Sequence, residues 1–402
     1  MKIPVTIAIF VIIAIATFCL RRYETFQTTK QAKTRHTSAS TTSISPLQSH
    51  KDEVDAGITK HNATSHVIYS HEYKYESIGG LPDSSFSQDG NLFGTGQFAP
   101  VLSENDPTTL RIWDVHSHSL FRAMKIPRLR NFAFSPDHKY ISVITGTKER
   151  YGYSYPYTVK TYDLRSGRPK HVLVKAGTIP AAFYHIIYSR NGRYIAADAG
   201  NSKICVWNAT TGKRIALFSI HGFATSIAFS PDGNTLAAAS GQEGWQAEAR
   251  LSTWSIHSQK LLRSIKLNQN LNGVTFSPNG KLIVAGGYLL TGLIYTFPYI
   301  MDAHTLKIKH PLQKIIDSSE GFRVAFSPDG NYLAFANDTF VYVYKLRDMT
   351  HAVARFPIPY QIDSVGTDPI LLAIHFTSSR QLTWAVSSYE QTYKITLWQG
   401  TF

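Results

Sequence analysis

A short segment that recurs through most of the chain constrains the fold more than any other feature of the sequence. Its clearest copy is Phe326-Ser327-Pro328-Asp329-Gly330, which separates two apolar stretches. Proline presets its backbone φ, aspartate hydrogen-bonds to the turn backbone, and glycine accepts a positive φ. The segment therefore predicts a tight turn between two antiparallel strands.

The same turn is predicted at six places, and a degenerate seventh copy follows. The six copies begin at Phe86, Phe134, Tyr188, Phe229, Phe276 and Phe326. The seventh begins at Phe376 and lacks the turn residues. These aromatic positions are spaced by 48, 54, 41, 47, 50 and 50 residues. Repeats of this length that contain only strands are typical of the four-stranded blades of a propeller.

Each unit also carries a predicted third strand, which in several units ends in an aromatic residue followed by a polar one. Examples are Trp113-Asp114, Tyr162-Asp163, Trp207-Asn208 and Trp254-Ser255. In these endings, residues 66–402 resemble the WD-repeat family. The resemblance implies an all-β, seven-bladed β-propeller of four-stranded antiparallel blades.

The chain departs from the family in one respect. The family's glycine–histidine pair and its buried His, Ser, Asp and Trp network are mostly absent, and blade four alone offers several members, His221, Ser240 and Trp254. We therefore expect the blades to depend on apolar packing between sheets. Large aromatic residues at one place in the repeat suit that packing. A structural role is predicted for four tryptophans, Trp113, Trp207, Trp254 and Trp398.

The ends of the repeat region predict how the ring closes. The last unit ends with Ile395-Thr396-Leu397-Trp398 and has no fourth strand of its own. An isolated strand is predicted at residues 66–73, before the first full unit. If this strand adds to the outside of the last blade, the ring closes without an open edge.

Residues 1–22 are predicted to be an N-terminal membrane anchor. Ile3 to Leu20 is an apolar stretch between Lys2 and Arg21. As a helix it would reach roughly 27 Å, close to the ~30 Å core of a bilayer. Two alternatives stay open, a signal peptide cleaved after Ala16 and lipidation at Cys19. The basic residues that follow favour a cytoplasmic propeller, whereas the short lysine-bearing start favours export.

Residues 23–65 are predicted to be a flexible linker, because they are rich in Ser, Thr, Lys and Gln and have no hydrophobic period. The formal net charge of the whole chain is +14, which favours acidic partners. No basic run with interleaved aromatic residues occurs, so nucleic acid is not the expected partner. The two cysteines, Cys19 and Cys205, give no disulfide framework.

No enzyme motif is recognisable. The sequence has no Walker phosphate loop, dinucleotide glycine fingerprint, zinc-protease helix or nucleophile elbow. No catalytic residue, cofactor or metal is therefore predicted. His116-Ser117-His118 has a spacing that a metal could use, but it falls where a solvated turn is expected.

Four long connections between second and third strands are rich in aromatic residues. They are residues 97–109, 148–157, 242–248 and 288–299. Loops on a rigid scaffold often carry function, and Tyr and Trp are enriched among binding hot spots. The predicted partner-binding residues are Tyr151, Tyr153, Tyr155, Trp245, Tyr295 and Phe297. The alternative is that these rings only cap the ends of the blades.

Two functions therefore remain after the sequence analysis. The first is a membrane-tethered, non-enzymatic scaffold for protein–protein interaction. The second is a propeller hydrolase or lyase with a small-molecule or sugar site at the central channel. Two or more buried acids with strongly shifted pKa values at the channel would favour the enzyme.

Overall fold

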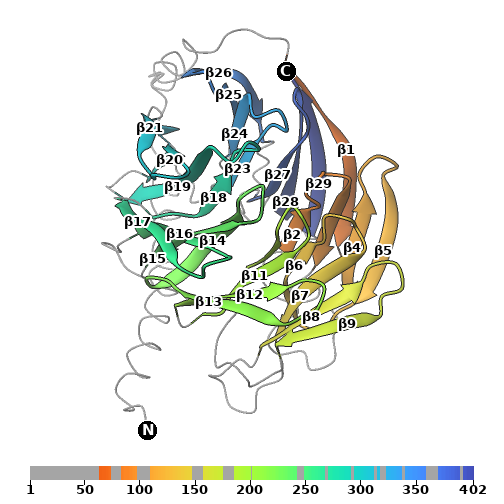
Figure 1. The fold of residues 1–402 in the computed structure, drawn as a ribbon. Helices are drawn as coiled ribbons and strands as arrows, with labels where there is room; N and C mark the ends of the chain where they lie inside the picture. Colours follow the sequence, from red (N-terminus) through yellow and green to blue (C-terminus); the bar gives the residue numbers. More distant parts are fainter. Residues whose placement is uncertain are drawn as a thin grey trace, which may run out of the picture. The chain divides into compact units, whose positions relative to one another are not determined.

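The structure is a computed structural model of the chain, shown in Figure 1. It describes residues 63–73, 83–96, 109–146, 157–174, 185–200, 202–241, 249–267, 270–290, 294–311, 315–316, 323–336, 340–358, 370–389 and 393–402. The predicted anchor and most of the predicted linker lie outside these residues. Among the residues that are described, no helix is long and apolar enough to cross a membrane.

Seven antiparallel sheets form the blades, numbered here in chain order. Blade one is β2 (Asp83–Phe86), β3 (Leu92–Gly96), β4 (Thr109–Asp114) and β5 (Ser119–Lys125). Blade two is β6 (Leu129–Phe134), β7 (Tyr140–Gly146), β8 (Tyr157–Asp163) and β9 (Pro169–Val174). Blade three is β10 (Ile186–Tyr188), β11 (Tyr194–Asp198), β12 (Lys203–Asn208) and β13 (Arg214–Ser219). Blade four is β14 (Phe223–Phe229), β15 (Thr235–Gly241), β16 (Ala249–Ser255) and β17 (Leu261–Leu267).

The remaining blades follow the same order from the inner to the outer strand. Blade five is β18 (Gly273–Phe276), β19 (Leu282–Leu290), β20 (Ile294–Asp302) and β21 (Ile308–Pro311), with β22 (Ile315–Ile316) also paired to β20. Blade six is β23 (Arg323–Phe326), β24 (Tyr332–Ala336), β25 (Phe340–Lys345) and β26 (Asp348–Pro357). Blade seven is β27 (Ile370–Ser378), β28 (Gln381–Tyr389), β29 (Tyr393–Thr401) and β1 (Thr64–Tyr73).

The ring closes as the sequence predicts. β1 pairs antiparallel with β29, with Val67 opposite Trp398 and His71 opposite Ile395, so the first strand of the described residues is the outer strand of the last blade. Figure 1 shows β1 alongside the strands of blade seven. The inner strands β2, β6, β10, β14, β18, β23 and β27 contact one another in that order, and β27 contacts β2. The seven-bladed propeller is therefore confirmed.

Six inner turns share one hydrogen-bond pattern. In blade six, the Ser327 hydroxyl donates to Asp329 Oδ1 at 2.6 Å and accepts the backbone N–H of Tyr332 at 2.9 Å. The Gly330 N–H donates to the Ser327 carbonyl, and Gly330 has a φ of 70°. The other five turns place the serine at Ser87, Ser135, Ser189, Ser230 and Ser277. The serine therefore joins both strands to the turn, which explains its recurrence.

The polar residue after the third-strand aromatic has a local role. Asp114 Oδ1, directly after Trp113, accepts the backbone N–H groups of His116 and Ser117, at 3.0 and 2.7 Å. Asn208 Oδ1 accepts those of Thr210 and Thr211 in the same way. The aromatic-plus-aspartate ending is thus the start of the turn to the outer strand, because an Asx side chain can satisfy the turn backbone.

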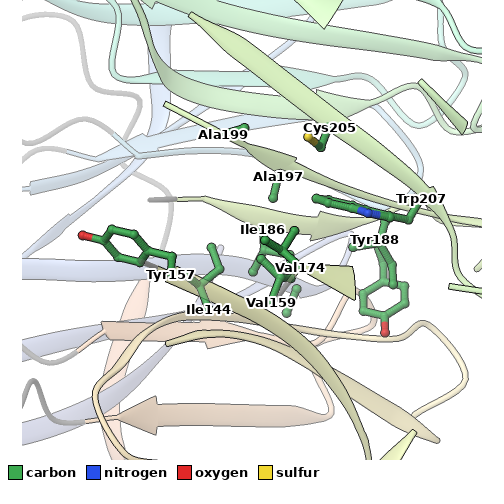
Figure 2. Packing of buried hydrophobic residues seen from close by; sticks show 12 residues of the cluster. Ile144, Tyr157, Val159, Val174, Ile186, Tyr188, Ala197, Ala199, Cys205 and Trp207 are labelled. Carbon is green, nitrogen blue, oxygen red and sulfur yellow. The ribbon is translucent and has the colours of Figure 1, made fainter. Parts of the chain in front are cut away.

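The core lies between neighbouring blades. Figure 2 shows one such cluster, in which Ile144 and Val159 from blade two pack against Ile186 and Trp207 from blade three. Both faces of each central strand are covered by another sheet, so strands such as β15 are buried almost throughout. Packing of this kind buries enough apolar surface to hold the ring without a complete hydrogen-bond network.

The tryptophans differ in burial. Trp113, Trp207 and Trp254 have exposed fractions of 9%, 1% and 4%, whereas Trp398 is half-buried and stacks on Trp384 with ring centroids 6.4 Å apart. Trp384, in β28, has an exposed fraction of 0% and was not among the predicted structural residues. The structural role of the four predicted tryptophans remains a prediction, which substitution can test.

Candidate functional site

The propeller has two distinct ends, which we call the turn end and the loop end. The inner turns lie at the turn end, where turns of adjacent blades touch: a Cβ on Gly233 would lie 2.5 Å from Asn191 Nδ2. Asn191 Nδ2 also donates to the Asp232 carbonyl at 2.7 Å. Because strands alternate in direction within each blade, the connections between second and third strands leave from the opposite, loop end.

Most of the predicted partner-binding residues belong to connections at the loop end. Residues 147–156 connect Gly146 of β7 to Tyr157 of β8, and residues 242–248 connect Gly241 of β15 to Ala249 of β16. Tyr151, Tyr153, Tyr155 and Trp245 themselves lie outside the described residues. Their convergence on one face therefore stays a prediction.

The prediction that residues 288–299 form a loop is wrong for Tyr295 and Phe297, which belong to a strand. Tyr295 and Phe297 lie in β20, which pairs with β19 up to Leu290 opposite Ile294. Tyr295 is opposite Leu289, and Phe297 is opposite Gly287. The segment is therefore an extended hairpin of blade five. The physical reason is its run of apolar, aromatic and β-branched residues, which favours strand pairing over an irregular loop.

Blade three holds a histidine–aspartate pair at the loop end that the sequence analysis did not find. Asp198 Oδ1 accepts the backbone N–H of His185 at 2.6 Å, and Asp198 Oδ2 lies 3.4 Å from His185 Nδ1. Asp198 has an exposed fraction of only 2%. This pair fixes the start of β10 to the end of β11. Blade three therefore has a buried aspartate bonded to a histidine of the same blade.

The central channel is an open cavity of about 770 Å³, lined by the inner strands of all seven blades. Asp89 is the one acid among its lining residues in the described part of the chain. Burial alone would raise the pKa of Asp89, but hydrogen bonds from Ser87 and the Asn91 N–H, with nearby His138, hold that pKa below its usual value. An ionised carboxylate suits a turn anchor better than a proton donor.

Two histidines from neighbouring blades flank Asp89. His138 of blade two lies 3.0 Å from its carboxylate, and the partly buried His375 of blade seven lies against Gly90 and Phe86. Burial lowers the pKa of His375 to about 4, although the Asp89 carboxylate opposes this shift. The described residues hold no group of three or more His, Cys, Asp or Glu placed to bind a metal.

One side chain crosses part of the channel mouth. Gln88 Nε2 of blade one donates to the Tyr188 carbonyl of blade three at 2.9 Å. Gln88 stands where blades two, four, five and six have proline. The sequence analysis missed this contact and the Asp89–His138–His375 cluster, because their members lie in different blades and no local spacing relates them.

The structure is thus a closed propeller, and the longest connections between its strands are at the loop end. A sequence model of the WD domain, G-beta repeat, matches residues 212–244, which run from the last turn of blade three to the start of the β15–β16 connection. The repeat therefore begins with the outer strand of one blade and continues into the next. That offset is the reason why β1 must complete blade seven.

Several curated proteins are similar to this chain at low identity. The WD repeat-containing protein AAC3 of Dictyostelium discoideum is 26% identical over 167 residues, which cover 41% of this chain and 33% of the relative. Apoptotic protease-activating factor 1 of Homo sapiens is 23% identical over 235 residues, 48% of this chain and 18% of the relative. The Tol-Pal system protein TolB of Francisella tularensis is 28% identical over 195 residues, 47% of this chain and 42% of the relative.

The matched regions cover less than half of the length of each of these relatives. The chain thus forms a seven-bladed propeller that contains one match to the WD repeat, and it is similar at low identity to a WD-repeat protein.

Proposed function

We propose that the protein is a non-enzymatic scaffold for protein–protein interaction, with its partner surface at the loop end. The observation that carries the proposal is the uneven length of the connections there. Blades one, two and four have long connections, and blade five extends its hairpin to Leu290 and Ile294. A propeller needs none of this length to close, and rigid scaffolds commonly carry function on such segments.

The arrangement of the blades groups these segments. Blades one and two are neighbours, as are blades four and five, and blade three stands between the two pairs. Its connection from Asp198 to Lys203 is short, and His185 holds the Asp198 end in place. Two pairs of blades with long connections, on either side of a blade with a short one, would suit a partner that contacts several blades at once.

A protein partner fits both the fold and the charge of the chain. WD-repeat propellers generally bind proteins, and the net charge of +14 favours a partner with acidic groups. The aromatic residues Tyr151, Tyr153, Tyr155 and Trp245 would supply contact area with few rotatable bonds.

Two substitutions at the loop end test the proposal, Tyr153→Ala and Trp245→Ala. The full-length protein is crosslinked in its own cells, and captured proteins are compared with those of the parent. We expect each variant to fail to capture specific proteins that the parent captures, while its melting temperature equals that of the parent. Phe121→Ala, which removes an exposed aromatic ring on β5, is the matched control and should still capture these proteins. A lowered melting temperature without loss of any partner would mean that the rings only cap the blades.

The proposal includes a membrane tether formed by residues 3–20, an apolar stretch long enough to span a bilayer. Extraction of membranes with alkaline carbonate should leave the protein in the pellet, with an N-terminal sequence at or near Met1. Recovery of a soluble form that begins at Thr17 would show cleavage after Ala16 instead. That result would remove the tether and leave the loop-end proposal standing.

A further inference from the structure

A pair of buried polar residues lies in blade one. Ser84 of β2 is opposite Thr95 of β3, and the hydroxyl oxygens of both are buried. Thr95 has an exposed fraction of only 1%. Neither hydroxyl has a hydrogen-bond partner in the described part of the chain. A buried hydroxyl without a partner costs free energy, so this pair requires a physical explanation.

At the same place the six other blades have two apolar residues. The place is defined by the third strand, because Thr95 comes two residues after Phe93, which is opposite Trp113. The equivalent pairs of blades two to seven are Phe132 and Val143, Ile186 and Ala197, Ile227 and Ala238, Val274 and Ala285, Val324 and Phe335, and Leu371 and Val386. The two hydroxyls of blade one therefore replace an apolar contact that every other blade has.

Both hydroxyls face the seam between blades seven and one. Side chains two positions apart on a strand point to the same face of the sheet. Phe93 of β3 packs with Ala385 of β28 in one buried cluster, so Thr95 faces blade seven. Ser84 shares this face, because directly opposite residues of an antiparallel pair point to the same side.

Blade seven adds two more hydroxyls to this seam. Thr383 and Ser387 stand two residues before and two residues after Ala385 on β28, so they face blade one. Their exposed fractions are 0% and 2%, and no described residue hydrogen-bonds to either hydroxyl oxygen. The seam thus contains four buried hydroxyls without a partner among the described residues.

The seam between blades two and three has the contrasting arrangement. There the Ser142 hydroxyl lies 2.9 Å from Thr161 Oγ1 and 2.7 Å from the hydroxyl of Tyr188, which belongs to blade three. Side chains thus satisfy the buried hydroxyl of that seam. Where side chains do not, ordered water commonly satisfies such groups. Ser84 also lines the open central channel, so the seam between blades seven and one borders on solvent.

The same seam has the fewest apolar residues. In the described part of the chain its cluster comprises six buried and four partly buried hydrophobic residues, whereas the cluster between blades two and three comprises twelve and two. Each of the five remaining seams has at least twelve such residues in total. We therefore expect separation of blades seven and one to cost less hydrophobic free energy than separation of any other two neighbours.

We propose that the seam between blades seven and one binds ordered water through its four buried hydroxyls, and that the propeller opens at this seam first. Opening separates the sheet of blade one from that of blade seven. It leaves the pairing of β1 with β29 intact, because both strands belong to blade seven. Water that bonds to the hydroxyls stays bound as the blades separate, so these polar groups add little to the cost. The proposal does not depend on a partner at the loop end.

Thiol labelling of the full-length protein tests where the ring opens. Ser387→Cys places a thiol in this seam, and Ala239→Cys places one at the equivalent position of blade four, in the cluster with blade five. Both variants also carry Cys19→Ser and Cys205→Ala, so that each protein has a single thiol. A buried thiol reacts with a soluble reagent only when its surroundings open, so the rate of reaction reports the opening.

We expect the thiol of Ser387→Cys to react at least about tenfold faster than that of Ala239→Cys, because local opening adds to global unfolding at the first site. Adding Ser84→Ala and Thr95→Val removes two hydroxyls with little change of shape. This addition should slow the reaction of the Ser387→Cys thiol at least about tenfold, because the seam gains apolar contact. Equal rates for the two thiols would overturn the proposal. So would a rate that the two added substitutions leave unchanged.

A crystal structure of the protein tests the water itself. It should show ordered water within hydrogen-bond distance of Thr95 Oγ1 and Ser387 Oγ. A dry seam at these two hydroxyls would overturn the proposal, whatever the labelling rates. Neither measurement uses a partner protein, so failure of the loop-end proposal would leave both results intact.

Discussion

His138 Nε2 lies 3.0 Å from Asp89 Oδ1, and this contact joins the inner turn of blade two to that of blade one. His138 occupies the place of glycine in the other turns and has a φ of 54°. The residue with this strained, left-handed backbone is thus also the residue that bonds to the neighbouring blade. Comparable contacts join other neighbours, as Asn191 does with the Asp232 carbonyl. The inner turns therefore form a ring in which each turn helps to place the next.

Gly233→Ala should destabilise the domain, because this ring leaves no room for a Cβ. The φ of Gly233 is 75°, and a Cβ would lie 2.5 Å from Asn191 Nδ2. The left-handed backbone alone costs about 1–2 kcal/mol for a residue with a side chain. Denaturant unfolding should show a loss of at least about that size.

Gly146→Ala is the control for this prediction. Gly146 ends β7, and the nearest atom to an added Cβ is Arg130 Nε at 3.8 Å. We expect no loss of stability there, and a gain of roughly 0.4–1 kcal/mol is possible through the unfolded state. Equal losses at the two glycines would contradict the ring of turns.

The stability of the fold should depend on His375 below neutral pH. Burial lowers the folded-state pKa of His375 to about 4, from the ordinary histidine value of about 6.5. Above pH 6.5 the ring is neutral in both states, so its contribution to stability is fully present. Between pH 6.5 and about 4 the unfolded chain binds the proton first, and the free energy of unfolding falls.

Denaturant unfolding at pH 7.5 and pH 4.5 measures this effect, with His375→Gln as the comparison. The parent should lose more stability between these two pH values than the variant does. The aspartates of the inner turns titrate below this pH range. For example, hydrogen bonds from Ser327 and the Asn331 N–H outweigh the burial of Asp329 and lower its pKa to about 2. Identical pH profiles of parent and variant would show that His375 is protonated as easily in the folded state.

Trp207→Ala should destabilise the domain by about 3–5 kcal/mol, as expected for truncation of a large buried aromatic residue. Its exposed fraction is 1%, and it packs with Tyr188 and Ile186 between blades two and three. Val172→Ala, on the exposed face of β9, should change stability little. A melting temperature of Trp207→Ala equal to that of the parent would argue against a structural role.

Deletion of residues 66–78 should destabilise the whole propeller, because it removes most of β1 and opens the edge of β29. If only one end of the domain frayed, that part would unfold in a separate step at a lower temperature. We expect instead a single transition at a lower temperature in calorimetry. Deletion of residues 23–60, which lie outside β1, should leave the transition where it is. If both truncated proteins melt like the parent, closure through β1 does not stabilise the ring.

The fold was predictable because each blade is specified locally. Ser327, Asp329 and Gly330 lie within one turn, and the same chemistry recurs at regular intervals, so both the strands and their number can be counted. Even the closure by β1 followed from counting, since an outer strand was missing at one end of the repeat region and extra at the other. The error at Tyr295 and Phe297 arose where length was taken as a sign of a loop.

The candidate sites were far less predictable. The aromatic residues near the loop end could be identified as a group, but which of them share a face depends on segments between strands that have no periodic pattern. The contact between Gln88 and the Tyr188 carbonyl could not be predicted at all, because the two residues lie in blades one and three.

The sequence by itself determined the blade, since a strand–turn–strand unit is set by residues a few positions apart and by an alternating apolar pattern. Only the tertiary structure decided what happens between blades. Asp89 lies beside His138 and His375, and Gln88 donates to the Tyr188 carbonyl, although these residues are distant in the chain. Contacts of this kind depend on side-chain orientation across a packed interface, which no local spacing encodes.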